Sequence, residues 1–276
     1  FVRESGASRR FSPPVLLLHG WFASGGLNWI RAFEPLSKFH RICAPALQAH
    51  ASSEPDGPQH GVTRRFTIER CADDMAELLN GLFPGEPALV IGYSLGGMVA
   101  QALWRRHPQT VAGLVLGATS AAPVPVSRGR RPFAGLMNAA RESSLLFDRL
   151  TRMPRRAAQR FQSSFPQPAW SPFIHNSLGH WAPSEFTGHH WPTVLDTGRA
   201  IAEFDAREWI GEVDVPTSVI LTERDSLIPP AQQHAMASAI ENAHLQTIDA
   251  GHFACIRDDF GSRLLDSCHA VTEGLS

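Results

Sequence analysis

Apolar and polar residues alternate along this chain in the rhythm of strands and helices that follow one another. Short apolar runs, each of a length suited to a buried strand, occur near residues 15–18, 40–44, 88–92, 111–117, 217–221 and 245–248. Helical patterns fall near residues 27–38, 67–82, 97–107, 230–241 and 257–273. This alternation predicts an α/β fold: a mostly parallel, doubly wound sheet with helices on both faces.

The rhythm breaks between residues 121 and 205. Prolines recur there, at positions 123, 125, 132, 154, 166, 168, 172, 183 and 192, and no apolar strand is evident. Helices near 132–150 and 154–164 fit the pattern. We therefore expect an insertion between two strands of the sheet.

A candidate nucleophile lies where the apolar run ending at Ile91 leads into the pentapeptide G-Y-S-L-G at residues 92–96. A strand, this pentapeptide and a helix together are typical of a nucleophile elbow. Gly92 and Gly96 remove side chains that would clash in so sharp a turn, which lets the Ser94 hydroxyl point into a cleft. A purely structural turn is the alternative.

A serine nucleophile needs a base and a group that orients the base. The apolar run at 217–221 is followed by Asp225, and the run at 245–248 is followed by His252. A serine, an aspartate and a histidine at strand ends, in this order, form a candidate catalytic triad. A surface aspartate and a buried histidine are the alternatives.

The first apolar run ends in His19-Gly20-Trp21. Gly20 permits a turn that aims the Trp21 amide at the cleft, and the Leu95 amide follows the candidate nucleophile directly. Two amides aimed at one point form an oxyanion hole. We expect His19 to hold the loop in place rather than to react.

These motifs resemble those of the α/β-hydrolase superfamily, in particular its bacterial, esterase-like enzymes with a serine nucleophile and an H-G-W motif. The similar segments span nearly the whole chain, at residues 3–6, 19–21, 92–97, 215–217, 225 and 250–253.

The resemblance implies a role for each candidate residue and requires no cofactor or metal. Ser94 would be the nucleophile, His252 the general base and Asp225 the carboxylate that orients it. The Trp21 and Leu95 amides would form the oxyanion hole.

The resemblance also implies a domain organisation. Residues 1–120 and 206–276 would form the α/β-hydrolase core, and residues 121–205 a helical cap over the serine. An irregular surface insertion is the alternative to the cap.

The implied activity is cleavage of a carboxylic ester or related acyl bond, in a small and apolar substrate, through an acyl-enzyme intermediate. Acyl transfer, perhydrolysis and C–C bond hydrolysis use the same triad, and a non-enzymatic ligand-binding relative is a further alternative. A serine at the elbow, rather than aspartate, argues against epoxide hydrolase and dehalogenase chemistry.

Composition narrows the class further. The chain has 276 residues, is 43% hydrophobic and carries a formal net charge of -1, so we expect a substantial core and no nucleic-acid partner. Its four cysteines show no C-x-x-C spacing, which predicts reduced thiols and a cytoplasmic location. Neither a membrane span nor a signal peptide is evident.

Because the chain opens on Phe1, inside an expected strand, we expect a trimmed protein that lacks one or two edge strands.

Two features of the insertion invite functional interpretations. Nine arginines between positions 128 and 160 fit a solvated helix face better than an anion site. Four histidines, at 175, 180, 189 and 190, lie among tryptophans at spacings that match no zinc motif. For these aromatic residues we expect core packing, or the lining of an apolar substrate tunnel.

The loop at residues 46–53 departs from the family pattern. Where the family has D-x-R-G-H-G-x-S, this chain has A-L-Q-A-H-A-S-S, which retains only His50 and Ser53. Alanines replace glycines that can take positive φ, so we expect strain near the oxyanion loop.

Overall fold

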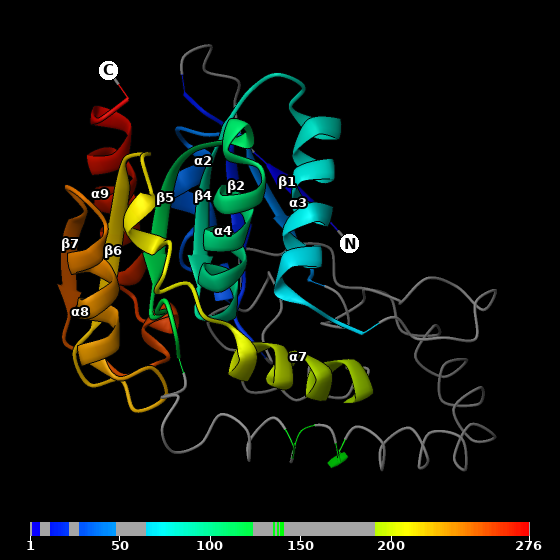
Figure 1. Cartoon of the computed structure of the whole chain (residues 1–276). Coiled ribbons are helices and arrows are strands. Elements are labelled where there is room, and N and C mark those ends of the chain that lie inside the picture. Colours follow the sequence, from blue (N-terminus) through cyan, green and yellow to red (C-terminus); the bar gives the residue numbers. More distant parts are fainter. Residues whose placement is uncertain are drawn as a thin grey trace, which may run out of the picture.

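The computed structural model describes residues 12–21, 28–47, 65–123, 135, 137, 139–140 and 194–275, and the backbone of residues 2–5 and 191–193. In this part of the chain seven strands form one sheet, in the order β1-β3-β2-β4-β5-β6-β7 (Figure 1). The strands are β1 (Val2–Ser5), β2 (Val15–Leu18), β3 (Ile42–Pro45), β4 (Ala88–Tyr93), β5 (Val111–Gly117), β6 (Thr217–Thr222) and β7 (His244–Ile248).

Strand direction brings the motif-bearing loops to one edge of the sheet. Strand β1 runs antiparallel to β3, and the remaining neighbours pair in parallel. In the register of the sheet, Leu18 lies beside Gly92, and Tyr93 lies beside Gly117. Because parallel strands end at the same edge, the residues that follow β2, β4 and β6 gather there.

Helices cover both faces of the sheet, which confirms the doubly wound arrangement (Figure 1). One face carries α3 (Ile68–Leu82), α4 (Leu95–Arg106) and α8 (Pro230–Ala239), and the other carries α2 (Phe33–Ser37) and α9 (Phe260–Glu273). Short 3-10 turns lie at η1 (Pro108–Thr110), η3 (Ile210–Glu212) and η4 (Ala254–Ile256).

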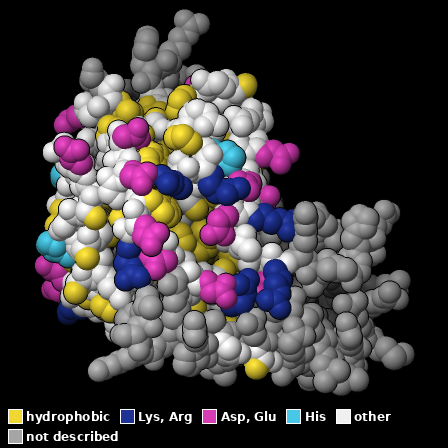
Figure 2. All heavy atoms as spheres, viewed as in Figure 1, with side chains coloured by type: hydrophobic (Ala, Val, Ile, Leu, Met, Phe, Trp, Pro, Cys, Tyr) yellow, Lys and Arg dark blue, Asp and Glu magenta, His cyan; other side chains and the backbone are white. Residues whose placement is uncertain are grey.

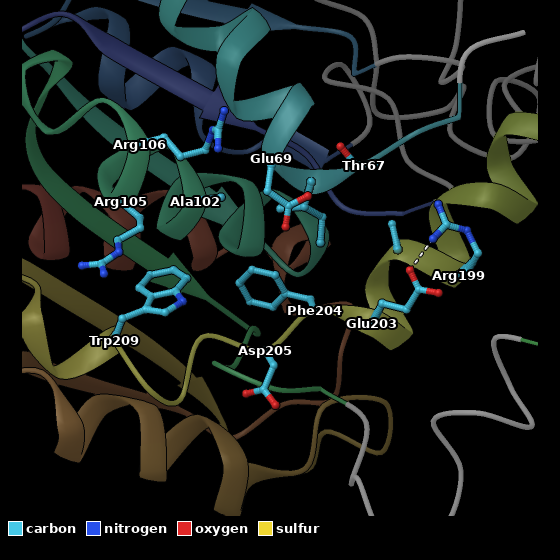
Figure 3. Close-up of a pocket in the computed structure, with 12 residues that line it drawn as sticks. Thr67, Glu69, Ala102, Arg105, Arg106, Arg199, Glu203, Phe204, Asp205 and Trp209 are labelled. Atoms are coloured by element: carbon cyan, nitrogen blue, oxygen red, sulfur yellow. Dashed lines mark hydrogen bonds and ion pairs between the residues drawn. The ribbon is translucent and has the colours of Figure 1, made fainter.

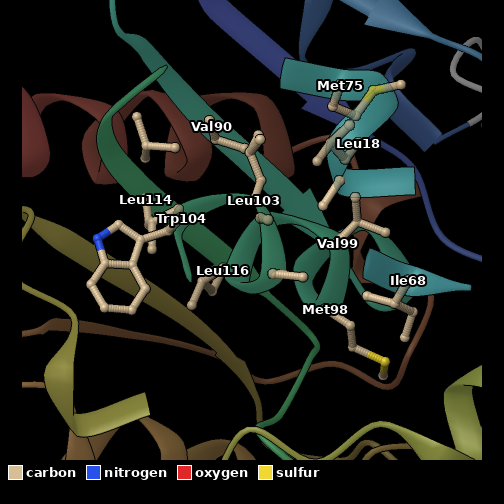
Figure 4. Close-up of a cluster of buried hydrophobic side chains, with 14 of the residues drawn as sticks. Leu18, Ile68, Met75, Val90, Met98, Val99, Leu103, Trp104, Leu114 and Leu116 are labelled. Atoms are coloured by element: carbon tan, nitrogen blue, oxygen red, sulfur yellow. The ribbon is translucent and has the colours of Figure 1, made fainter. Parts of the chain in front are cut away.

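Two hydrophobic clusters follow from the two-residue period of the strands. In β4, Ala88 and Val90 pack into the cluster under α3 and α4, whereas Leu89 and Ile91 pack on the opposite face. Figure 4 shows Val90 among leucine, methionine and tryptophan side chains of the first cluster. The four cysteines are all buried and divide between the clusters, with Cys43 and Cys71 in the first and Cys255 and Cys268 in the second.

Most expected elements lie within a few residues of their predicted bounds. Helix α3 begins where predicted, because the Thr67 side chain accepts a hydrogen bond from the Arg70 amide at 3.1 Å and caps the helix. The helix expected over 27–38 was too long: a turn at residues 30–32 interrupts it, and α2 covers only Phe33–Ser37.

Helix α7 (Trp191–Glu203) was not predicted. Two of its side chains form a buried ion pair within the helix, with Arg199 Nε 3.0 Å from Asp196 Oδ1. Both side chains also hold the backbone of Phe66, whose amide donates to Asp196 Oδ2 at 2.5 Å and whose carbonyl accepts from Arg199 at 3.0 Å. The helices expected at 132–150 and 154–164 fall almost wholly outside the described residues. None of the described helices combines the length and apolar character needed to cross a membrane.

Candidate active site

The turn between β4 and α4 holds Ser94 in a conformation that side-chain-bearing residues rarely adopt. Its φ is 53° and its ψ is -116°, a strained region of backbone space. A Cβ on Gly92 would lie 2.3 Å from the Gly96 carbonyl oxygen, and one on Gly96 would lie 2.0 Å from the Leu18 carbonyl oxygen. The prediction that both positions require glycine is therefore confirmed.

Backbone hydrogen bonds fix this turn from both sides. The Ser94 amide donates to the Gly117 carbonyl at 2.9 Å, which extends the pairing of β4 with β5. The Ser94 carbonyl accepts from the Gly97 amide at 2.9 Å and from the Thr119 hydroxyl at 2.8 Å. The side chain of Ser94 thus projects from a rigid turn at the start of α4.

The structure brings the three predicted triad residues together from three separate loops. His252 Nε2 lies 3.0 Å from Ser94 Oγ, and His252 Nδ1 lies 2.8 Å from Asp225 Oδ2. Since an ionised carboxylate only accepts hydrogen bonds, the ring proton belongs on Nδ1. Nε2 is then the acceptor that faces the serine hydroxyl.

The carboxylate of Asp225 is buried and accepts hydrogen bonds on both oxygens. Oδ1 accepts from the Leu227 and Ile228 amides, each at 2.9 Å. Oδ2 accepts from His252 and from the Thr222 hydroxyl at 2.8 Å. Burial alone would raise the pKa of Asp225, but the bonds from His252, Ile228 and Thr222 favour the ionised form and hold the pKa below its usual value.

The single tyrosine of the chain holds the histidine loop in place. The Tyr93 hydroxyl donates to the His252 carbonyl at 2.6 Å, and its ring centroid lies 6.0 Å from that of His252. Burial raises the pKa of Tyr93 well above its usual value, so the phenol stays protonated and remains a donor. The residue before Ser94 therefore also fixes the backbone of His252.

The loop after β2 lies against Ser94. A Cβ built on Gly20 would lie 3.4 Å from Ser94 Cβ. The Gly20 amide donates to Asn28 Oδ1 at 2.7 Å, so this amide already has an acceptor within the protein. Leu95 is the first residue of α4, and the helix does not use its amide.

His19 connects this loop to the one that follows β3. Its Nε2 accepts from the Leu47 amide at 2.9 Å, and its Nδ1 lies 2.9 Å from the Gly20 carbonyl oxygen. These contacts fit the structural role expected of His19 and join Leu47 to the loop that follows β2. Residues 48–53 lie outside the described part of the chain, so the strain expected there stays a prediction.

No cluster of three or more histidine, cysteine or carboxylate side chains suited to a metal occurs among the described residues. The histidines at 175, 180, 189 and 190 lie outside them, as do the nine arginines between positions 128 and 160. On the face in Figure 2, acidic and basic side chains are interspersed rather than gathered by sign.

A surface cavity of about 310 Å³ lies between α3, α4 and α7 (Figure 3). Ala102 in its wall is about 10 Å along the helix axis from Leu95. Its arginines have acidic partners: Arg105 pairs with Glu212, and Arg199 with Glu203. None of the triad residues lines this cavity, so it is no part of the candidate site.

Sequence reasoning missed four residues that support the candidate site: Tyr93, Asn28, Thr222 and Gln233. Tyr93 lies within the pentapeptide at residues 92–96, and Thr222 ends the strand that precedes Asp225. Their closeness to these motifs could have marked both residues. Nothing in the pattern around Asn28 or Gln233 marks them, because their contacts depend on distant loops.

The chain belongs to the α/β hydrolase fold family, whose model matches residues 13–259, and it is an enzyme of this class. It is similar to a pimeloyl-[acyl-carrier protein] methyl ester esterase of Aromatoleum aromaticum, with 31% identity over 249 residues that cover 87% of this chain and 91% of the relative. The enzyme of that name from Chromobacterium violaceum is 30% identical over 236 residues, 84% of each chain.

Solved structures show the same fold. The enol-lactonase from Burkholderia xenovorans LB400 superposes with a TM-score of 0.73 at 22% identity, covering 98% of this chain and 96% of the lactonase. At this identity the likeness supports the fold alone.

Proposed function

We propose that this protein is a serine hydrolase that cleaves carboxylic esters through an acyl-enzyme intermediate. Two contacts support this proposal. Ser94 Oγ lies 3.0 Å from His252 Nε2, and His252 Nδ1 lies 2.8 Å from Asp225 Oδ2. This geometry supports proton removal from the serine by a histidine whose tautomer is fixed.

In this mechanism Ser94 Oγ attacks the ester carbonyl carbon while its proton passes to His252 Nε2. The C–O bond to the alcohol then breaks, and the alcohol leaves with that proton. Water attacks the acyl-enzyme in the same way and releases the acid and the free serine. Asp225 stays ionised throughout and stabilises the imidazolium.

The Trp21 and Leu95 amides are the proposed donors to the oxyanion of each tetrahedral intermediate. Their support is positional: the Gly20–Trp21 turn lies against Ser94, and Leu95 opens the helix that follows it. Each such donor is typically worth about 3 kcal/mol of transition-state stabilisation.

The names of the two relatives suggest the substrate class to test first, a methyl ester of an acyl chain. We assign residues 121–205 to a helical cap over the triad. Helix α7 supports this assignment, because the Trp21 indole donates to the Val194 carbonyl at 2.9 Å.

The buried cysteines fit a reducing compartment, so we place the protein in the cytoplasm.

The test is covalent labelling of the nucleophile combined with ester turnover. A fluorophosphonate should label Ser94 in the wild type, and Ser94→Ala should abolish both the labelling and the hydrolysis of p-nitrophenyl and methyl esters of rising acyl chain length. Ser226→Ala, at an exposed serine near Asp225, is the matched control and should behave as the wild type. If Ser94→Ala kept more than about a tenth of the wild-type rate, the nucleophile assignment would be wrong, because triad losses cost several orders of magnitude.

A further inference from the structure

Gln233 of α8 is fully buried directly behind the candidate acid. Its Oε1 accepts from the Thr222 amide at 3.1 Å, and its Nε2 donates to the Ile228 carbonyl at 2.7 Å. These two backbone groups fix the orientation of the side-chain amide, because a flipped amide would oppose donor to donor and acceptor to acceptor.

The second hydrogen of Gln233 Nε2 is directed at the Thr222 hydroxyl. Nε2 lies 2.9 Å from Thr222 Oγ1, whereas Asp225 Oδ2 is farther away, at 3.3 Å. A primary amide has two hydrogens, and Ile228 takes the other. Gln233 therefore acts on Asp225 mainly through Thr222.

The single hydrogen of the Thr222 hydroxyl goes to Asp225 Oδ2, at 2.8 Å, rather than to Gln233 Oε1, at 3.3 Å, because the charged oxygen is nearer and is the stronger acceptor. Oδ2 is the same oxygen that faces His252 Nδ1. Three groups thus form one directed chain of hydrogen bonds, from the Gln233 amide through the Thr222 hydroxyl to the carboxylate of Asp225.

We propose that Thr222 and Gln233 are positioning residues, which hold the carboxylate of Asp225 in the rotation that orients His252 toward Ser94. This inference rests on the proposed function. The backbone amides of Leu227 and Ile228 hold Oδ1, and the Thr222 hydroxyl, itself held by Gln233, fixes the place of Oδ2. The hydrogen bond from the Thr222 hydroxyl also stabilises the ionised carboxylate and keeps it a weak base. The imidazole proton therefore stays on Nδ1.

The test compares Thr222→Val and Gln233→Met with Asp225→Asn, singly and in combination. Readouts are kcat, KM, the rate constant of Ser94 labelling by a fluorophosphonate, and the melting temperature, with all rates measured well below the lowest melting temperature. We expect Thr222→Val to lower kcat and the labelling rate about tenfold, the effect of losing one hydrogen bond to a charged group, with KM little changed. Gln233→Met should lower both rates by a smaller factor, because it removes the partner that holds the Thr222 hydroxyl. In the Asp225→Asn background Thr222→Val should have almost no further effect.

Two matched variants separate positioning from general destabilisation. Gln232→Met changes the neighbouring, half-buried glutamine of α8, whose Oε1 has no hydrogen-bond partner among the described residues, and should leave the rates unchanged. Thr222→Ser keeps the hydroxyl and should restore most of the rate lost in Thr222→Val, even if its melting temperature stays low.

The outcomes distinguish the two proposals. Full activity of Asp225→Asn and Ser94→Ala would overturn the triad itself. If Asp225→Asn is damaging, two results would overturn the positioning role alone. One is a Thr222→Val variant that lowers the rate by the same factor in the Asp225→Asn background as in the wild type. The other is a Gln233→Met variant that keeps the full labelling rate. Should Thr222→Val fail to fold, Thr222→Ser and Gln233→Met still decide through the labelling rate.

Discussion

The indole nitrogen of Trp21 donates a hydrogen bond to the carbonyl oxygen of Val194, 173 positions later in the chain, at 2.9 Å. The same indole lies against Gly198, where a built Cβ would come within 2.7 Å of its ring. Helix α7 therefore fixes the side chain of the residue whose amide we assign to the oxyanion hole.

Gly198→Ala should displace the Trp21 ring and lower kcat. A misplacement of about 1 Å in an active site can cost about a hundredfold in rate, so we expect a loss between tenfold and a hundredfold. Gly81→Ala in α3, where a Cβ meets nothing within 4 Å, is the control and should keep full activity with a slightly higher melting temperature. Equal activity of the two variants would show that α7 does not influence the oxyanion loop.

The strained backbone of Ser94 predicts that two inactive variants differ in stability. Ser94→Ala keeps the Cβ at φ 53°, whereas Ser94→Gly removes it. Strain of this kind costs about 1–3 kcal/mol, and glycine loses about 0.5–1 kcal/mol in chain entropy. Ser94→Gly should therefore melt at a higher temperature than Ser94→Ala in calorimetry, and a lower one would contradict strain at this turn.

Asp225→Asn should lower kcat by about four orders of magnitude while the protein still folds. Each carboxylate oxygen faces hydrogen-bond donors, so the new NH₂ group must oppose either the Leu227 and Ile228 amides or the side of His252 and Thr222. In the second case His252 loses the tautomer that leaves Nε2 as the base. Glu223→Gln, at an exposed neighbour, is the control; if it proved the damaging change, the acid would be reassigned.

The lowered pKa of Asp225 predicts a pH-dependent difference in stability. Its ionised form is favoured by folding, so it stabilises the protein above its usual pKa of 3.8, and this contribution is lost as the pH falls through the lower folded-state value. The gap in melting temperature between wild type and Asp225→Asn should therefore narrow as the pH is lowered from 6 to 3. A constant gap would mean that the carboxylate charge adds nothing to stability.

The sequence was informative where chemistry is local to the chain. The turn around Ser94 needs glycines at fixed spacing, and Asp225 and His252 directly follow apolar strands, so all three could be predicted from pattern alone. The sheet was predictable for the same reason, because buried parallel strands are continuous apolar runs.

Helix α7 and Gln233 could not be found in this way. Helix α7 is placed by the ion pair of Asp196 and Arg199 with the backbone of Phe66, more than 120 residues earlier. Gln233 looks like any polar residue of a helix, and only the packing of α8 on β6 buries it behind Asp225. Contacts between distant segments leave no periodic signal in either of the two partners.

Because buried cysteines lie on both faces of the sheet, the rates at which their thiols are modified can report which part of the native protein opens. Burial raises the thiol pKa of Cys71 in α3 and of Cys268 in α9, and it raises that of Cys255 beside the histidine loop to about 12. An alkylating reagent should therefore modify these thiols only when the surrounding layer opens. Equal rates at Cys71 and Cys268 would mean that both helical layers leave the sheet in one cooperative step, whereas faster modification of Cys255 would reveal that the loop carrying His252 opens while the rest of the molecule stays closed.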